Sequence, residues 1–327
     1  MLRYIIRRLL YAIPVLLAVS VLSFIVIELP PGDYVTSRMM ELEMQGTPGT
    51  AAQREAMTRQ YALDRPGYER YFKWMGGLLR GDLGMSFMFN RPVEELIGER
   101  ILLTMTIAIL SMLLTWSIAI PIGIYSATHQ YSVSDYVFTL IGFVGVSMPP
   151  FLLAMVLMYV AFTHFDLPIT GLFSTDYATE PWSVGKFVDM LKHIWMPALI
   201  IGAAGTAGLI RVMRACLLDE LRKQYVTTAR ARGLTETRLI FKYPVRVAIN
   251  PLLSTVGWML PAVVSGEVIV SIVLNLPTVG PMLFAALKSQ DMYLAGSLIM
   301  ILCALTIIGT LISDILLAWS DPRIRYE

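Results

Sequence analysis

Long apolar runs dominate the pattern of hydrophobic and polar positions along this chain. A helix needs about 20 apolar residues to cross the apolar core of a bilayer, and six runs reach that length with few charges. They are Leu9–Leu29, Ile101–Tyr125, Tyr136–Phe162, Ile194–Met213, Ala248–Leu274 and Leu294–Trp319. The runs lack the period-two alternation of a transmembrane barrel, so they should be helices. The pattern predicts an all-α integral membrane protein with six transmembrane helices.

The first run resembles a secretory signal peptide because Arg3, Arg7 and Arg8 precede it. It is longer than the apolar region of such a peptide, and no A-x-A cleavage site follows it. We therefore interpret this run as an uncleaved first span.

The Lys and Arg residues of the loops predict the orientation, because cytoplasmic loops are richer in them. The N-terminal arginines place that end of the chain in the cytoplasm. With six spans, the connection between the fourth and fifth lies on the same side, and it is strongly basic. Its Lys and Arg residues are Arg214, Arg222, Lys223, Arg230, Arg232, Arg238, Lys242 and Arg246. The third-to-fourth loop, on the opposite side, has only Lys186 and Lys192, so both termini are expected in the cytoplasm.

Two non-membrane segments interrupt what is otherwise a single transmembrane domain over residues 1–327. The first, residues 30–100, precedes a core of five helices over 101–320 and should lie outside the cytoplasm. Its apolar positions predict an amphipathic helix, because they recur at helical spacing. They are Tyr68, Tyr71, Phe72, Met75, Leu78 and Leu79. We favour a cap packed on the outer ends of the spans, and contact with an outside partner is the alternative.

The second segment, the cytoplasmic loop 215–247, is the most informative part of the chain. It predicts a short helix that ends at Gly233, because glycine tolerates the left-handed conformation found at helix ends. Tyr225, Thr228, Ala229 and Arg232 are spaced to share one face of that helix. Such a face suits docking into a partner's groove. A basic segment lying on anionic lipid is an equally good interpretation.

Composition agrees with a membrane protein. Apolar residues make up 56% of the chain, and charged residues make up 15%, against about 25% in a soluble domain. The net charge of +2 gives no argument for a nucleic-acid partner. Cys216 and Cys303 form neither a CxxC motif nor a Cys/His cluster, so we expect no structural disulfide and no metal site.

Sequence motifs for bond chemistry are missing. There is no GxxxxGK[ST] loop to cradle a nucleotide phosphate and no GxSxG nucleophile elbow. His129, His164 and His193 stand apart from one another along the chain. The sequence therefore predicts that the chain is not an enzyme, and we expect no catalytic residue.

Charged residues and prolines within the runs mark candidate positions along a transport path. Charged groups are costly inside a bilayer and usually face protein or water. Glu267 is one such group, although a structural role is favoured for it, and Asp314 is expected to be structural. Pro149 and its neighbour Pro150 should kink the third run. The possible path residues are Glu267, Pro149 and Trp258.

The inner loop resembles a known pattern. Residues 225–234 read YVTTARARGL, which is similar to the coupling-helix signature of ATP-binding-cassette (ABC) importer permeases. Other blocks resemble the first membrane subunit of oligopeptide and dipeptide importers, in the peptide/nickel/opine transporter family. They are PPGD at 30–33, GDLGMS at 81–86, RPV at 91–93, GEV at 266–268 and DPRIR at 321–325. Their order and spacing relative to the six runs make the resemblance specific, and it covers nearly the whole chain.

The resemblance implies a type I ABC importer permease fold in a bacterial or archaeal inner membrane. It also implies partners: a second, homologous permease subunit, two cytoplasmic ATPase subunits and an extracytoplasmic solute-binding protein. ATP and Mg would be bound by the ATPases, and this chain would hold no cofactor. Tyr225, Thr228, Ala229, Arg232, Gly233 and Leu234 would dock the ATPase. Membrane lipid surrounds such a protein, and no nucleic acid is involved.

Some positions depart from the family pattern. Thr227 and Thr228 stand where the general signature has Glu and Ala, so no role passes to that Glu. Residues 37–60 match no pattern we can place. The leading substrate is an oligopeptide or dipeptide, and an oligosaccharide, an opine or a nickel chelate is the alternative. A secondary carrier is a weaker alternative, and a membrane enzyme has no catalytic residues to support it.

Overall fold

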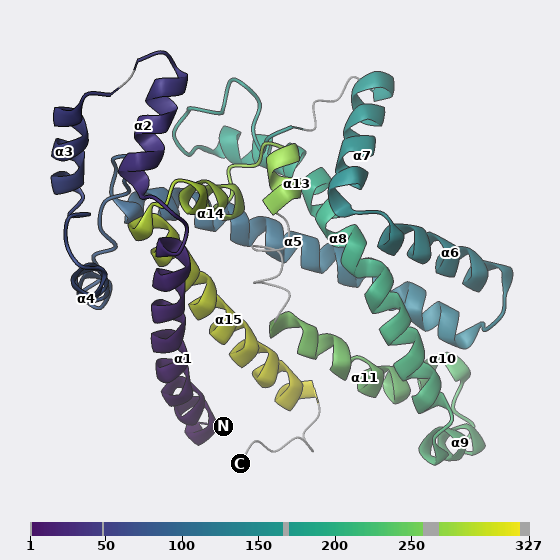
Figure 1. Ribbon diagram of the computed structural model, residues 1–327. Helices are drawn as coiled ribbons and strands as arrows, with labels where there is room; N and C mark the ends of the chain where they lie inside the picture. Colours follow the sequence, from purple (N-terminus) through teal and green to yellow (C-terminus); the bar gives the residue numbers. More distant parts are fainter. Residues whose placement is uncertain (1, 48, 166–169, 258–267, 321–327) are drawn as a thin grey trace. The chain divides into compact units, whose positions relative to one another are not determined.

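The computed structural model describes residues 2–47, 49–165, 170–257 and 268–320, and its elements over these ranges are α-helices (Figure 1). In chain order the bounds are α1 Leu2–Glu28, α2 Tyr34–Met44, α3 Ala51–Gln60, α4 Gly67–Leu78, α5 Val93–Thr128, α6 Val133–Ser147, α7 Pro150–Phe165, α8 Val184–Leu221, α9 Gln224–Ala231, α10 Glu236–Lys242, α11 Pro244–Ala248, α13 Val268–Val273, α14 Val279–Lys288 and α15 Met292–Ser320. Residues 250–257 are also helical.

Several helices have the length and composition of membrane spans. Within the described residues, three are long and apolar enough to cross a bilayer: most of α1, all of α5 and all of α15. The helix α8 makes a fourth when its two straight halves are counted as one span. These four correspond to the first, second, sixth and fourth of the predicted runs.

The third predicted run is interrupted at its prolines, where the sequence predicted only a kink. The helix α6 ends at Ser147 and α7 begins at Pro150, so Pro149 lies between two shorter apolar helices. The fifth run includes residues 258–267, Pro261 among them, which lie outside the described residues.

The helix α8 bends by 54° between its halves Val184–Ala203 and Gly205–Leu221. Gly202 lies next to this bend and against α5. A Cβ atom built on Gly202 would be 2.7 Å from Thr115 Oγ1, and that hydroxyl donates a 3.1 Å hydrogen bond to the Gly202 carbonyl. The run of small residues here thus permits the close helix contact that small residues allow in membrane proteins.

The chain divides into two compact units, which are described separately. The first contains Met1–Ile5, Met105–Pro277 and Thr306–Glu327, and the second contains Ile6–Thr104 and Thr278–Leu305. In the first unit, α8 packs against α6, α7 and α11. Residues of α5, α8, α11 and the helical stretch 250–257 form its buried core: Ala119, Ile124, Ala127, Leu209, Met213, Leu217, Val245, Ala248 and Leu252.

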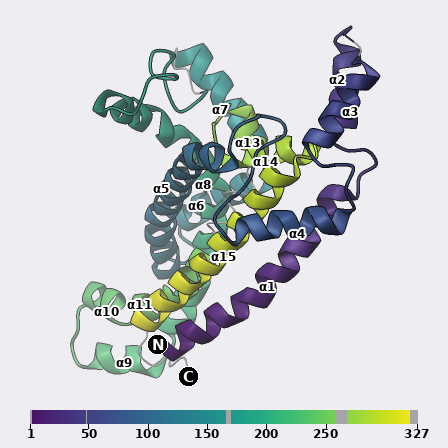
Figure 2. The same cartoon turned by 90° about the vertical axis from the view of Figure 1, so that its left-hand side faces the viewer.

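In the second unit, α4 lies along α1 (Figure 2). The hydroxyls of Tyr71 and Ser20 are 2.9 Å apart, and the Tyr71 ring contacts Phe24 edge to face. Arg70 donates two hydrogen bonds, of 2.7 and 2.5 Å, to the Glu28 carboxylate. The predicted amphipathic helix is therefore present and packs against α1, and its place outside the cytoplasm stays a prediction.

The buried face of α4 differs from the predicted one. Trp74 and Met75 are buried, whereas Tyr68 and Phe72 are 64% and 69% exposed. The reason is Trp74, which the apolar spacing did not single out. Its ring packs against Gly296 of α15, where a Cβ atom would be 2.7 Å from Trp74 Cζ2.

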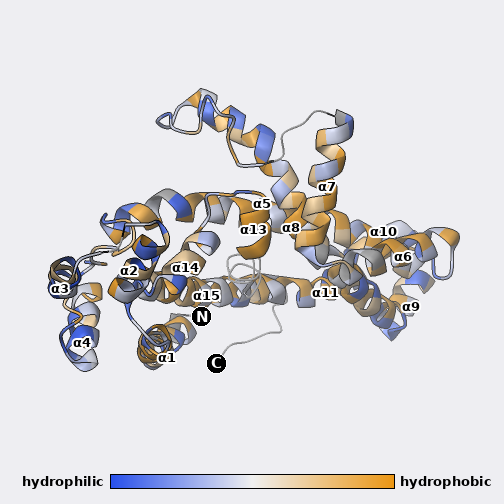
Figure 3. Ribbon diagram, turned by 45° about the horizontal axis from the view of Figure 1, so that its top comes forward, coloured by the Kyte–Doolittle hydropathy of each residue, from blue (hydrophilic) through white to orange (hydrophobic). Residues whose placement is uncertain are grey.

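The hydropathy of the residues differs between the helices. Hydrophilic residues colour α3 and parts of α4 and α9, and hydrophobic residues colour α7 and α13 (Figure 3).

Candidate functional site

The helix α9 is a short element of the loop 215–247, and it packs closely against α10. Two residues, Arg222 and Lys223, connect it to the end of α8. Its residues Val226 and Ala229 pack against Leu239 of α10, with Leu234 and Tyr243 alongside. Figure 1 shows α9, α10 and α11 beside the C-terminal part of α8. The loop is thus a folded unit rather than an extended strand of charge.

Four of the six predicted docking residues are exposed. Tyr225, Thr228, Arg232 and Gly233 are open to solvent, and Leu234 is half-buried. Ala229 differs, because it is only 8% exposed. The spacing predicted Ala229 on the same face as Tyr225 and Thr228. In the structure it packs against Leu239 of α10, so it stabilises the position of α9 instead of facing a partner.

Gly233 ends the helix as predicted. Its φ angle is +77°, a conformation that costs little for glycine alone. A Cβ atom built there would meet no atom within 4 Å. The turn therefore depends on glycine for its backbone conformation, and the space around it is free.

Polar contacts fix α9 at both ends. The Tyr225 hydroxyl donates a 2.5 Å hydrogen bond to Glu220 of α8. Burial and then this hydrogen bond raise the pKa of the Tyr225 hydroxyl, so it remains a donor at neutral pH. Arg230 forms an exposed ion pair with Glu236 at the start of α10.

The loop is linked to the membrane helices through one side chain of α10. Ile240 packs against the small cluster of α9 and also against the core of α5, α8 and α11. A displacement of α9 would therefore be passed to α8 through packed side chains as well as through the backbone.

The exposed surface of the loop is basic. Its exposed Lys and Arg residues are Arg222, Lys223, Arg230, Arg232, Arg238, Lys242 and Arg246. The exposed acidic residues in the same stretch are Asp219 and Glu236, and Glu236 is paired with Arg230. Positive charge of this kind attracts an acidic partner surface or anionic lipid.

The candidate path residues are only partly placed. Pro149 is exposed in the break between α6 and α7. Trp258 and Glu267 lie outside the described residues, so their roles stay predictions. Asp314 accepts a 2.7 Å hydrogen bond from the Tyr4 hydroxyl, which gives it a structural contact within the first unit.

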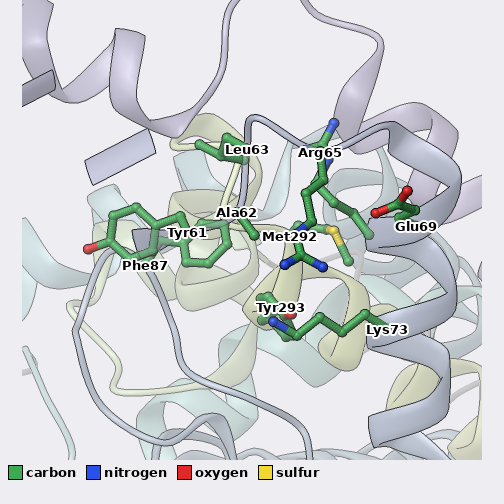
Figure 4. Close-up of a pocket in the computed structure, with 10 residues that line it drawn as sticks. Tyr61, Ala62, Leu63, Arg65, Glu69, Lys73, Phe87, Met292 and Tyr293 are labelled. Atoms are coloured by element: carbon green, nitrogen blue, oxygen red, sulfur yellow. The ribbon is translucent and has the colours of Figure 1, made fainter. Parts of the chain in front are cut away.

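The second unit has a large surface groove, with a volume of about 1050 Å³, between α2, α3, the loop after α4 and α14. Aromatic and methionine side chains line it, including Tyr34, Tyr61, Phe87 and Met57, and Arg38 pairs with Glu41 at its wall. Methionine side chains adapt to surfaces of different shape. A small neighbouring pocket shares Tyr61 and Phe87, and Figure 4 shows it with Arg65, Glu69 and Lys73.

The GDLGMS block at 81–86 leads directly into Phe87 and Met88, which line this groove. Gly84 has a φ of +80° and lies against the Tyr293 ring, where a Cβ atom would be 2.3 Å from Cδ1. The buried carboxylate of Asp291 accepts hydrogen bonds from Ser86 Oγ at 2.6 Å and from Met88 N at 3.0 Å. The sequence patterns missed Asp291, because nothing near it in the chain marks it as a partner of this loop.

Comparison with known proteins assigns the chain to a class of membrane protein. A family model described as "Binding-protein-dependent transport system inner membrane component" matches residues 119–326, and a companion model for the N-terminal part of such membrane components matches residues 1–108. The chain belongs to this family. It is the membrane subunit of an ABC importer.

Relatives match the permease over nearly its whole length. It is 35% identical over 324 residues to the oligopeptide transport system permease protein AppB of Bacillus subtilis, with 99% of each chain covered. It is 32% identical over 327 residues to the glutathione transport system permease protein GsiC of Escherichia coli, and both chains are fully covered. The dipeptide transport system permease protein DppB of Escherichia coli K12 is 28% identical over 346 residues, again over both complete chains.

These matches confirm the resemblance, the all-helical membrane fold and the multi-pass inner-membrane location predicted from the sequence. A permease of this family works with a solute-binding protein and with ATPase subunits, and it has no ATPase site of its own.

Proposed function

We propose that this permease forms half of a translocation path for oligopeptides or dipeptides. Three relatives that it matches over full length are named for oligopeptide, dipeptide and glutathione transport, and glutathione is itself a small peptide-like molecule. An oligosaccharide, an opine or a nickel chelate would use the same mechanism and remains the alternative substrate.

The proposed topology has six spans and both termini in the cytoplasm. The four long helices or helix pairs support it, together with α6 and α7 as a broken third span. The fifth span would run from the helical stretch 250–257 to α13. Placing the basic loop with α9 in the cytoplasm agrees with the positive-inside rule.

The proposed assembly has two homologous permeases, two ATPases and one binding protein. In it, α9 docks into an ATPase, which binds ATP and Mg and carries out hydrolysis. Closure of the ATPases would pull α9, and the attached α8 would tilt to open the path outward. Hydrolysis would then return the path to its inward-open state.

One observation carries this proposal. The helix α9 is exposed on one side through Tyr225, Thr228 and Arg232, and on its other side Val226 is fully buried against α10. A helix that is fixed to the membrane core and open toward solvent suits force transfer from a partner.

The groove of the second unit is the surface we propose for the binding protein. It lies in residues 30–100 and α14, which the proposed topology places outside the cytoplasm. Its mixture of aromatic, methionine and charged side chains resembles the composition of protein interfaces, where aromatic residues, Met and Arg are enriched.

The deciding experiment is uptake by vesicles that contain the full complex with its binding protein. A labelled tripeptide and a labelled oligosaccharide would be tested with ATP and with a non-hydrolysable ATP analogue. ATP-dependent tripeptide uptake is the expected result.

The other outcomes each overturn a different part. Uptake of the sugar alone would keep the mechanism and replace the substrate. Uptake by this permease alone, driven by an ion gradient without ATP, would show a secondary carrier and reject the importer mechanism.

A further inference from the structure

A partly buried ion pair joins α6 to α8 in the first unit, and no motif singled it out. Asp135, in the first turn of α6, is 3% exposed. Its carboxylate accepts hydrogen bonds from Arg214 of α8, at 3.2 Å from Nε and 3.0 Å from Nη2. This two-pronged geometry is specific to arginine, because the planar guanidinium matches a carboxylate.

The same carboxylate also holds the turn between α5 and α6. Tyr131 donates its backbone N–H to Asp135 Oδ2 at 3.1 Å, and Ser132 Oγ accepts from the Asp135 backbone N–H at 3.1 Å. Tyr131 has a φ of +61°, an uncommon conformation for a residue with a side chain. The carboxylate therefore fixes both a turn of unusual geometry and its distance from α8.

Arg214 is close to the proposed docking helix along the chain. It lies ten residues before Gln224, the first residue of α9. Its neighbours Met213 and Leu217 are fully buried in the core with α5 and α11. Three elements are thus joined around this position: the half of α8 that leads to α9, Gly205–Leu221, which we call its inner half, then α11 and the α5–α6 turn.

The bend of α8 lies on the other side of Arg214. It separates Val184–Ala203 from Gly205–Leu221, so Arg214 belongs to the same straight half as the end that leads to α9. The ion pair ties the α5–α6 turn to that inner half only.

We propose that Asp135 and Arg214 form a tie that makes the α5–α6 turn, the inner half of α8 and α9 move as one rigid body, with the bend of α8 as the flexible point. The inference rests on the proposed function, because it assumes that an ATPase displaces α9. Both residues are positioning residues: they touch neither nucleotide nor solute, and they determine how far a displacement of α9 spreads.

The chain offers a matched control on the same helix. The Arg211 guanidinium lies over the Phe143 ring of α6, 5.7 Å from its centroid. It is also an arginine of the inner half of α8 that contacts α6, but this contact has no carboxylate. Arg211→Gln removes a charge and an α6 contact without touching the tie.

The experiment measures distances between spin labels in the assembled complex, with Cys216 and Cys303 replaced by Ser. One label pair, Val133→Cys with Thr227→Cys, joins the start of α6 to α9. A second pair, Val133→Cys with Leu199→Cys, spans the bend. All three labelled positions are exposed.

The wild-type protein should keep the 133–227 distance constant between the nucleotide-free and ATP-bound states, while the 133–199 distance changes. In Asp135→Asn the 133–227 distance should broaden and shift on ATP binding. Transport per ATP hydrolysed should fall by about tenfold, within the usual range of coupling between sites. Arg211→Gln should behave as the wild type.

Charge reversal and a milder variant protect the test against simple misfolding. Asp135→Arg combined with Arg214→Asp should restore part of the coupling that either single change removes. If Asp135→Asn fails to assemble, Arg214→Lys supplies the same measurement, because it keeps the charge and loses the two-pronged contact.

Two results would overturn the tie while leaving the importer mechanism intact. One is a 133–227 distance that changes with ATP in the wild type, and the other is a tie variant with unchanged distances and unchanged transport per ATP. Failure of the proposed function is a different result: no ATP-dependent change across the bend and no ATP-dependent uptake in the wild type.

Discussion

Asp291 accepts a 2.6 Å hydrogen bond from Ser86 Oγ, across 205 positions of the chain. The bond joins the residue before α15 to the loop whose residues Phe87 and Met88 line the groove of the second unit. Asp291 is fully buried, and it also accepts from Leu294 N at 3.1 Å, so one carboxylate caps α15 and anchors the loop. Burial raises the pKa of this carboxyl, although the hydrogen bonds from Met88 N and Ser86 Oγ act in the opposite direction.

Asp291→Asn should loosen the loop that precedes α5. The amide would point an N–H₂ group at donors that now face carboxylate oxygens, which costs about 1–3 kcal/mol for a buried polar group left unpaired. A lower thermal midpoint in detergent and faster chymotrypsin cleavage after Phe89 should result. Asp64→Asn, an exposed carboxyl in the same segment, is the control. Unchanged cleavage in Asp291→Asn would show that the loop does not depend on this carboxylate.

Gly233→Arg should uncouple the ATPases while the permease stays in the membrane. The new side chain would project from the docking surface, and a φ of +77° would strain it. We expect solute-stimulated ATP hydrolysis to fall by about tenfold or more, the effect of losing roughly 1.4 kcal/mol of docking free energy.

Gly46→Arg is a closely matched control for that change. Gly46 has a φ of +78° and also has no atom within 4 Å of a built Cβ, but it lies in residues 30–100 rather than in the loop that contains α9. The two variants carry the same backbone strain and the same added charge. Equal loss of ATP hydrolysis in both would contradict a specific role for the α9 surface.

Gly296→Ala should destabilise the second unit. Its Cβ atom would lie 2.7 Å from the Trp74 ring, and overpacking of this kind costs about 1–3 kcal/mol. Gly76→Ala on α4 should have the opposite effect, because a Cβ there meets nothing and alanine favours a helix by about 0.5–1 kcal/mol. Thermal unfolding of the two variants should shift in opposite directions, and a shared direction would refute the close approach.

The stabilising effect of Asp135 should vanish only in acid. Burial raises the pKa of its carboxyl, but hydrogen bonds from Arg214 and from Tyr131 N outweigh burial and hold the pKa below its ordinary value. An acid with a lowered folded-state pKa stabilises fully above its unfolded pKa, which is about 3.9, and loses that contribution as the pH falls through the folded value. The difference in thermal midpoint between wild type and Asp135→Asn should therefore be constant from pH 8 to pH 5 and shrink below about pH 4. A difference that already shrinks near neutral pH would assign the stabilisation to another group.

Local sequence patterns predicted the features that depend on neighbouring residues. Gly233 was correctly placed at a helix end, and Pro149 at a disturbance of the third run that proves to be a break, because backbone preference alone decides both positions. The face of α4 was partly wrong, since Trp74 points toward a glycine more than 200 positions away. Asp135 and Asp291 could not be found at all, because their partners lie 79 and 205 positions along the chain and a lone Asp in one sequence shows no partner.

On the docking surface, too, the sequence predicted the local structure but not the contacts with distant residues. The spacing of Tyr225, Thr228 and Ala229 correctly identified a helix, but only tertiary packing against Leu239 separates Ala229 from the exposed side. Trp258 and Glu267 were chosen for their chemistry and lie outside the described residues, so their place on a path stays a prediction.

The bend of α8 turns its inner half into a lever. Gly205–Leu221 is about 25 Å long at 1.5 Å per residue, so a change of about 10° in the bend would swing its end by about 4 Å. That displacement approaches the pitch of a helical turn, yet it needs only small rotations of the backbone near residue 204. The small residues on either side of this position thus place the fulcrum far from the basic surface, where a modest angular change becomes a large stroke.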